Sequence, residues 1–101
     1  MTATTTIPLA ALRAQKVAAL LALAHQAEVP IPANMHLSDE PHESDLRFHT
    51  LDPNVYRAWS KWLNAADYRD YPGSEFRTAL ATVELADLGR VTVHFAMKKD
   101  A

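Results

Sequence analysis

Two alternating stretches near the C-terminus, joined by a short turn sequence, constrain the fold more than any other feature of this chain. Between residues 78 and 97, apolar and polar side chains alternate with the period of two that is typical of a strand with one buried face. Between them, Asp87-Leu88-Gly89 supplies turn chemistry, with the glycine in the left-handed conformation. We predict a β-hairpin with these cross-strand pairs: Leu85 with Val91, Val83 with Val93, Ala81 with Phe95, Thr82 with His94 and Glu84 with Thr92.

A helix is predicted to begin at Asp52-Pro53, because an aspartate N-cap followed by proline at the first helical position is a strong start signal. One apolar stripe with helical spacing follows, and it consists of Val55, Trp59, Trp62, Leu63 and Ala66. Two tryptophans on such a stripe indicate core packing rather than a base-stacking platform. The residues from 67 to 74 provide the turn chemistry that ends this helix.

The first helix is predicted over about residues 6–27, with Thr6 as its cap and Pro8 tolerated in its first turn. Its apolar stripe consists of Val17, Leu20, Leu21 and Ala24, with Leu23 beside it. Towards the N-terminus the same face carries Arg13 and Lys16. Either this half projects beyond the sheet, or the two side chains lay their aliphatic stems along its edge and keep their charges in water.

The period changes to two between residues 33 and 51. Met35 with Leu37, and Leu46 with Phe48, indicate two half-buried strands joined by a long acidic loop over residues 38–44. The predicted order is helix, strand, strand, helix, strand, strand. We expect a two-layer α+β sandwich with a four-stranded, mostly antiparallel sheet and both helices on one face.

The whole chain is predicted to be one domain, residues 1–101, with disordered tails at 1–6 and 99–101. The absence of cysteine excludes disulfides, thiolate metal sites and cysteine nucleophiles. The net charge of −2 disfavours a protein with a globally basic surface for nucleic acid. The longest apolar run, residues 17–24, is too short to cross a bilayer, and no basic segment precedes it as in a signal peptide. We therefore expect a cytoplasmic protein that does not act at a membrane.

Strand parity leaves one sheet face uncovered by helices, and it carries His36, Arg47, His49, Thr78, Thr82, Glu84, Thr92 and His94. His36, His49 and His94 are candidate metal ligands, since imidazole binds many metals. No two of them share a strand, however, and the position of His94 depends on a strand order that the sequence does not reveal. A solvated polar face is the simpler interpretation, and we expect no metal site and no cofactor.

The acidic loop is the second candidate region, because four carboxylates and one imidazole lie within residues 39–45. It is interpreted as a solvated loop, a docking surface for a basic partner or, with less support, a cation site without the calcium-loop pattern. The tyrosines at 68 and 71 form either an interface hot spot or a lid over the core edge. The candidate partner-binding residues are Asp39, Glu40, His42, Glu43, Asp45, Arg47, Tyr68 and Tyr71.

No pattern predicts catalysis, since the serines lack a nucleophile-elbow context and both glycines are explained by turns. The leading hypothesis is a non-enzymatic module that binds a protein through the open sheet face, a sheet edge or the acidic loop. One alternative is a nucleic-acid-binding accessory protein that uses Arg47, the histidines, Lys98 and Lys99. A second is a metal-binding protein or metal-dependent hydrolase that uses the sheet-face histidines. A homodimer, either through open sheet edges or through face-to-face packing of the uncovered face that also carries Leu80, fits the pattern as well.

The chain resembles a loose group of small hypothetical proteins from actinobacteria, their phages and integrative elements. The resemblance lies in an Ala/Leu-rich first helix ending in Val29-Pro-Ile-Pro32, a short strand pair, the phrase from Leu51 to Trp59, and the strand from Gly89 to Phe95. It spans roughly residues 8–97. It implies a cytoplasmic accessory protein, with a phage or mobile-element regulator of a host protein as one form, and no established enzymatic activity. It transfers no functional residue.

Overall fold

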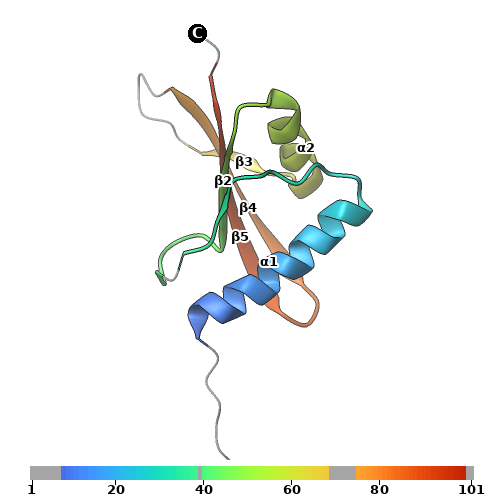
Figure 1. Ribbon diagram of the computed structural model, residues 1–101, viewed down its shortest axis with the longest axis vertical. Coiled ribbons are helices and arrows are strands. Elements are labelled where there is room, and N and C mark those ends of the chain that lie inside the picture. Colours follow the sequence, from blue (N-terminus) through green and yellow to red (C-terminus); the bar gives the residue numbers. More distant parts are fainter. Residues whose placement is uncertain (1–7, 39, 69–74, 100–101) are drawn as a thin grey trace, which may run out of the picture.

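A computed structural model describes residues 8–38, 40–68 and 75–99 of the chain. The elements, in chain order, are α1 (Leu9–Gln26), β1 (Met35–His36), β2 (Leu46–Thr50), α2 (Pro53–Leu63), β3 (Ala66–Tyr68), β4 (Phe76–Leu85) and β5 (Gly89–Lys98). The strands form one open sheet in the order β1-β2-β5-β4-β3, and both helices lie on the same side of it (Figure 1). The predicted α+β class and its arrangement of helices on one sheet face are confirmed.

One strand more than predicted belongs to the sheet. β3 pairs antiparallel with β4, with Ala66 opposite Leu80 and Tyr68 opposite Thr78. The prediction that Ala66 belongs to the second helix is wrong, because that helix ends at Leu63, where Asn64 adopts a left-handed conformation with φ of 51°. Within the described residues the sheet thus has five strands, and it is mostly antiparallel because β2 with β5 is the one parallel pair among them.

The C-terminal hairpin is confirmed, but its predicted register is wrong by two residues. Leu85 pairs with Gly89, Val83 with Val91, Ala81 with Val93, Ala79 with Phe95, Thr82 with Thr92 and Glu84 with Arg90. Gly89 has the expected positive φ, 86°, but it is already paired in β5, so the connecting loop contains only residues 86–88. A shift by two keeps every side chain on its predicted face, since the side-chain period is two.

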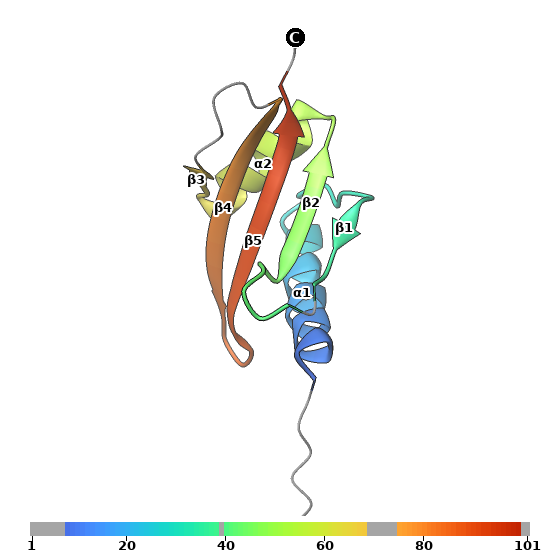
Figure 2. The same ribbon diagram turned by 90° about the vertical axis from the view of Figure 1, so that its left-hand side faces the viewer.

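The parallel pair of β2 with β5 follows from the helix between them. β2 leads directly into α2, which lies across one sheet face before the chain returns through β3, β4 and β5. Strands joined by such a crossover run parallel. In Figure 2, β5 lies between β2 and β4, in front of the two helices. This strand order places polar side chains of β2 beside those of β5 on the uncovered face.

Aromatic rings form the centre of the core between the helices and the sheet. The ring of Phe48 stacks on that of Phe95 at 5.2 Å and meets the indole of Trp59 edge-on at 5.0 Å. Trp59 is fully buried and Trp62 is partly buried, in agreement with core packing. Tyr56 is also buried, at a position that the predicted stripe left out. As predicted, the Asp52 side chain caps α2 by accepting a hydrogen bond from the N–H of Asn54 at 2.9 Å.

Helix α1 begins at Leu9 with Pro8 as its N-cap, and the predicted cap Thr6 lies outside the described residues. Its buried side chains are Arg13, Val17, Leu20 and Ala24. The helix ends in a Schellman motif, in which Glu28 has a φ of 60° and the N–H of Val29 donates to the carbonyl of Ala24 at 2.9 Å. Within the described residues, neither helix is both long and apolar enough to span a membrane.

The edge strand β1 is less buried than predicted. Met35 and Leu37 were expected to be half-buried, but they are about 38% and 41% exposed, whereas Leu46 and Phe48 in β2 are buried as predicted. β1 contains only two residues at the border of the sheet, so neighbouring side chains cover it on one side only. At the other end of the chain, the N–H of Lys99 donates to the carbonyl of Glu75 at 2.7 Å, which extends the β4–β5 hairpin by one pair.

Candidate functional site: the outer face of the sheet

The face of the sheet opposite the helices, called the outer face below, carries a row of basic side chains across three strands. His36 of β1 is the cross-strand partner of Arg47 of β2, and Arg47 is the partner of His94 of β5. His49 lies two residues beyond Arg47 on the same face of β2. We call His36, Arg47, His49 and His94 the outer-face cluster. It exists because the sheet order places β2 between β1 and β5.

A hollow of about 340 Å³ lies at β1 and β2. Six residues line it, three from β1 and the position before it and three from β2: Asn34, Met35, His36, Arg47, Phe48 and His49. Three members of the outer-face cluster therefore share one concave surface. Pockets that bind small ligands have volumes from about 300 Å³ upward, so the hollow is large enough for a small polar group.

The pKa of His94 is lowered by burial and by the charges around it. Partial burial lowers the pKa of His94 below the ordinary imidazole value of 6.5, and the positive charges of Arg47 and His49 lower it further, while Glu43 acts in the opposite direction. The charged groups that act on His94 are therefore Arg47 and His49 of the outer-face cluster, together with Glu43. The ring of His49 in turn packs against that of Phe76 at 5.5 Å.

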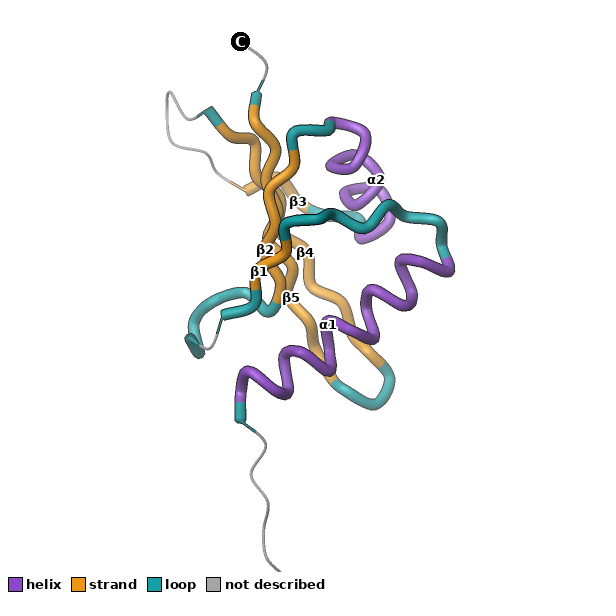
Figure 3. The backbone as a smooth tube through the Cα atoms, in the orientation of Figure 1, coloured by secondary structure: helices purple, strands orange, loops and turns teal. Residues whose placement is uncertain are grey.

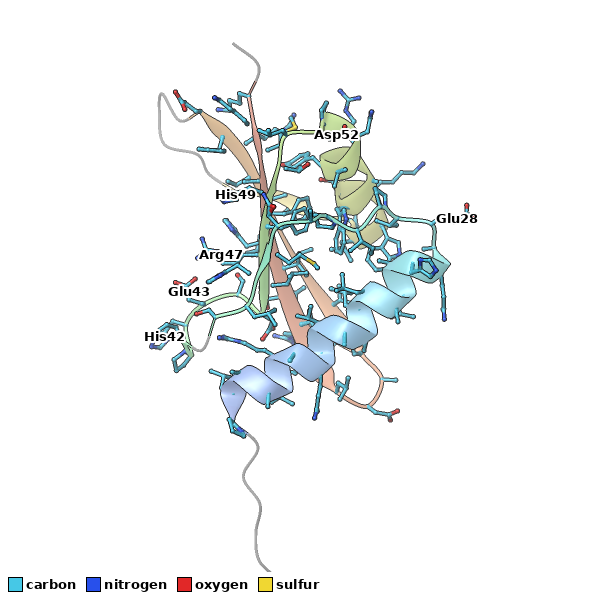
Figure 4. All side chains as sticks on the ribbon, in the orientation of Figure 1. Glu28, His42, Glu43, Arg47, His49 and Asp52 are labelled. Carbon is cyan, nitrogen blue, oxygen red and sulfur yellow. The ribbon has the colours of Figure 1, made fainter. Side chains whose placement is uncertain are left out.

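Glu43, in the loop between β1 and β2, reaches the outer-face cluster. Its Oε2 accepts a hydrogen bond from Nη1 of Arg47 at 2.5 Å, and the two side chains are 40% and 39% exposed. Figure 4 shows Glu43, Arg47 and His49 on the same side of the sheet, away from Asp52 and the helices. An ion pair this accessible contributes at most about 1 kcal/mol, because water and salt screen it. The contact is thus easy to exchange for another.

The same loop is held in place by the buried side chain of Arg13 in α1. Its guanidinium donates to three backbone carbonyls, those of Ser38 at 2.5 Å, Glu40 at 2.6 Å and Glu43 at 2.6 Å. Its Nε donates to Oδ1 of Asp45 at 3.1 Å. Figure 3 shows α1 starting beside this loop and running away from it. The expectation that Arg13 keeps its charge in water is wrong, because its guanidinium is buried and four of its five N–H groups donate hydrogen bonds.

Asp45 connects this loop to the sheet. While Oδ1 pairs with Arg13, Oδ2 accepts a hydrogen bond from the backbone N–H of Thr92 at 2.8 Å. Thr92 precedes Val93, which is the first residue of β5 to pair with β2. The side chain of Asp45 is only 14% exposed. Asp45 therefore serves the structure at the start of β2, and its charge is not presented to a partner as the sequence had suggested.

The remaining candidate residues have different positions. Glu40 and His42 are exposed on the loop. Asp39 and Tyr71 lie outside the described residues, and Tyr68 is described only as part of the backbone of β3. The acidic loop thus offers fewer available carboxylates than its composition indicates, since those of Glu43 and Asp45 already contact arginines.

The three candidate metal ligands do not form a shared set in the sheet. Arg47 lies between His36 and His94 in the cross-strand row. A guanidinium is permanently positive and opposes the binding of a cation beside it. Across residues 8–38, 40–68 and 75–99, no group of three or more histidine, aspartate or glutamate side chains is placed to hold a metal ion.

Comparisons of the chain with protein-family models, curated proteins and solved structures give no match.

Sequence reasoning placed the outer-face residues correctly but missed two relationships among them. The row of His36, Arg47 and His94 depends on β5 lying next to β2, for which no local signal exists. The role of Arg13 had a signal, because a cationic residue interrupts the apolar stripe of α1 at the position where a buried residue belongs. A buried arginine requires several acceptors, and the acidic loop is the nearest candidate source of them.

Proposed function

We propose that this protein is a non-enzymatic interaction module that binds another protein with the outer face of its sheet. The observation that supports this most strongly is the unequal covering of the two faces. Both helices cover one face, while the other carries the outer-face cluster beside an open hollow. The exposed Glu40 and His42 lie on the loop next to this surface and belong to its rim.

The biological context is also part of the proposal. The resemblance to small proteins of actinobacteria, their phages and integrative elements fits an accessory protein that acts in the cytoplasm on a host protein. An accessory protein of this kind needs a stable scaffold and one exposed recognition surface. The aromatic core and the Arg13 contacts support such a scaffold.

Quantitative affinity capture with matched variants tests this function. The full chain, R47E and R57E are immobilised at equal density and exposed to a bacterial lysate, and the retained proteins are quantified by mass spectrometry. Arg57 is exposed on α2, on the opposite side of the molecule, so R57E introduces the same charge change away from the outer face. We expect R57E to retain the same proteins as the full chain and R47E to lose them.

Equal retention by R47E and R57E would contradict the proposed surface. Retention that disappears after nuclease treatment would favour the nucleic-acid alternative instead. Light scattering of the purified chain identifies a homodimer, and a dimer that dissociates in R47E but not in R57E identifies a second copy of the chain as the partner.

A further inference from the structure

Within the sheet, the neighbours of Arg47 on the outer face include three imidazoles, while the carboxylate that contacts it, Glu43, comes from the loop. His36 and His94 flank Arg47 in the cross-strand row, and His49 follows on β2. A guanidinium is permanently positive, and the neighbouring imidazoles add further N–H donors on the same face. Guanidinium and imidazolium groups also make strong, short hydrogen bonds to phosphate oxygens. This composition favours an anion over a metal ion.

The hollow gives this anion a place on the surface. Four of the residues that line it are polar, namely Asn34, His36, Arg47 and His49, and His94 is coupled electrostatically to Arg47 and His49. A tetrahedral anion has several acceptor oxygens that point in different directions. It therefore matches donors that come from separate strands better than a flat carboxylate does.

The protein already places one anionic group against this arginine. The carboxylate of Glu43 contacts Nη1 of Arg47 with a single oxygen at 2.5 Å. A guanidinium carries five N–H donors, so this contact uses a small part of its capacity. Glu43 belongs to the loop, and its side chain is 40% exposed, so it can move away without disturbing the buried Arg13 contacts made by its carbonyl.

We propose that the hollow binds a phosphate group on a side chain of the partner protein, with Arg47, His36, His49 and His94 as donors, and that this group displaces the carboxylate of Glu43 from Arg47. This inference rests on the proposed function, because it places the phosphate group on a protein partner. Glu43 then acts as an internal competitor that occupies Arg47 until a phosphorylated segment arrives. The partner is a phosphoprotein.

Isothermal titration calorimetry of the full chain tests this site with N-acetyl-phosphoserine amide at pH 6.5, and with N-acetyl-serine amide as the uncharged comparison. We expect binding of the phosphorylated probe only. R47Q is expected to weaken this binding at least about tenfold, because a charge-assisted contact is lost. E43Q is expected to strengthen it about two- to fivefold, since it keeps the shape of Glu43 and removes the competing charge.

Thermal unfolding curves of R47Q and E43Q first establish that both variants are folded. R57Q serves as the control with the same chemical change on α2, and it should bind the probe like the unaltered chain. The proposal is overturned if the unaltered chain does not bind the phosphorylated probe, if R47Q binds it as well as R57Q does, or if E43Q weakens binding. Tighter binding of a single-stranded oligonucleotide than of phosphoserine amide would also overturn it, in favour of nucleic acid.

One additional arm separates this inference from the proposed function. The capture experiment is repeated with lysate that has been treated with phosphatase. If the retained proteins disappear, both proposals are supported. If they remain and are still lost with R47E, the outer face binds a protein but does not recognise its phosphate group, so only the inference fails.

Discussion

At the scale of single residues, Arg13 has the largest effect on the form of the candidate site. Its four hydrogen bonds order the loop that carries Glu43, although it lies on a helix distant in sequence. The pattern of α1 showed a cationic residue on an apolar stripe, but it did not show what this residue contacts. Three of its four partners are backbone carbonyls, and these cannot be identified from a sequence because every residue has one.

Replacement of Arg13 by methionine is expected to destabilise the fold by about 3 kcal/mol, because it leaves Oδ1 of Asp45 and three carbonyls without their donor. Chemical denaturation monitored by tryptophan fluorescence measures the free energy of unfolding. R57M, at an exposed position of α2, should change it by less than about 0.5 kcal/mol. Equal stability of R13M and R57M would show that the buried contacts do not stabilise the fold.

A substitution at Glu28 is expected to stabilise the fold. Its φ of 60° is unfavourable for a residue with a side chain, so E28G is expected to raise the free energy of unfolding by about 0.5 kcal/mol. Ala27 has an ordinary φ of −84°, and A27G should therefore destabilise the fold. The comparison is made by thermal unfolding, and a loss of stability in E28G would contradict the left-handed helix end.

At the scale of elements, local patterns predicted both helices, the hairpin and the identity of their faces. They did so because alternation in β4 and β5, and the Asp52-Pro53 start of α2, are properties of neighbouring residues. Local patterns did not predict the hairpin register, the short strand β3 or the exposure of Met35. Register depends on the number of loop residues, and β3 depends on a free edge of β4 being nearby.

The connection from α1 to β1 is held by an element-scale contact that predicts a specific loss. The indole N–H of Trp59 donates to the carbonyl of Pro30 at 2.7 Å in a partly buried position. W59F removes this donor and part of the buried ring, and we expect a loss of about 2 kcal/mol in the free energy of unfolding. W62F, at a partly buried position, should lose less than about 1 kcal/mol. Urea denaturation followed by circular dichroism measures both losses. Equal losses of unfolding free energy in W59F and W62F would contradict the contact.

At the scale of the whole molecule, strand order decides what the outer face can do. The sequence placed His36, Arg47, His49 and His94 on one face, but only the β1-β2-β5 order makes Arg47 the neighbour of two of these histidines. A guanidinium between two imidazoles disfavours a metal ion and favours an anion as the ligand of this face. Long-range order of this kind arises from how the helices pack, so no local pattern contains it.

The lowered pKa of His94 predicts how the stability of the whole fold depends on pH. Arg47, His49 and Glu43 act on this imidazole, and His36 lies in the same row. In the unfolded chain His94 takes up a proton near pH 6.5, whereas in the folded protein it does so only at lower pH. Its contribution to stability is therefore complete above this window and is lost as the pH falls through 6.5 towards the folded pKa.

Thermal unfolding between pH 8 and pH 5 measures this effect by comparing the unaltered chain with H94Q. The other titrating groups are the same in both proteins, so the difference isolates His94. We expect the unaltered chain to lose more stability below pH 6.5 than H94Q does. Parallel curves for the two proteins would contradict the lowered pKa of His94.

The most direct test of the proposed anion site is an NMR titration of the chain with phosphate at constant pH, compared with chloride of equal ionic strength. A phosphate group that accepts hydrogen bonds from the imidazole rings changes their environment. We predict that phosphate shifts the ring resonances of His36, His49 and His94, while those of His25 on α1 stay unchanged. Equal shifts at His25, or no shift at any of the three outer-face histidines, would contradict the site.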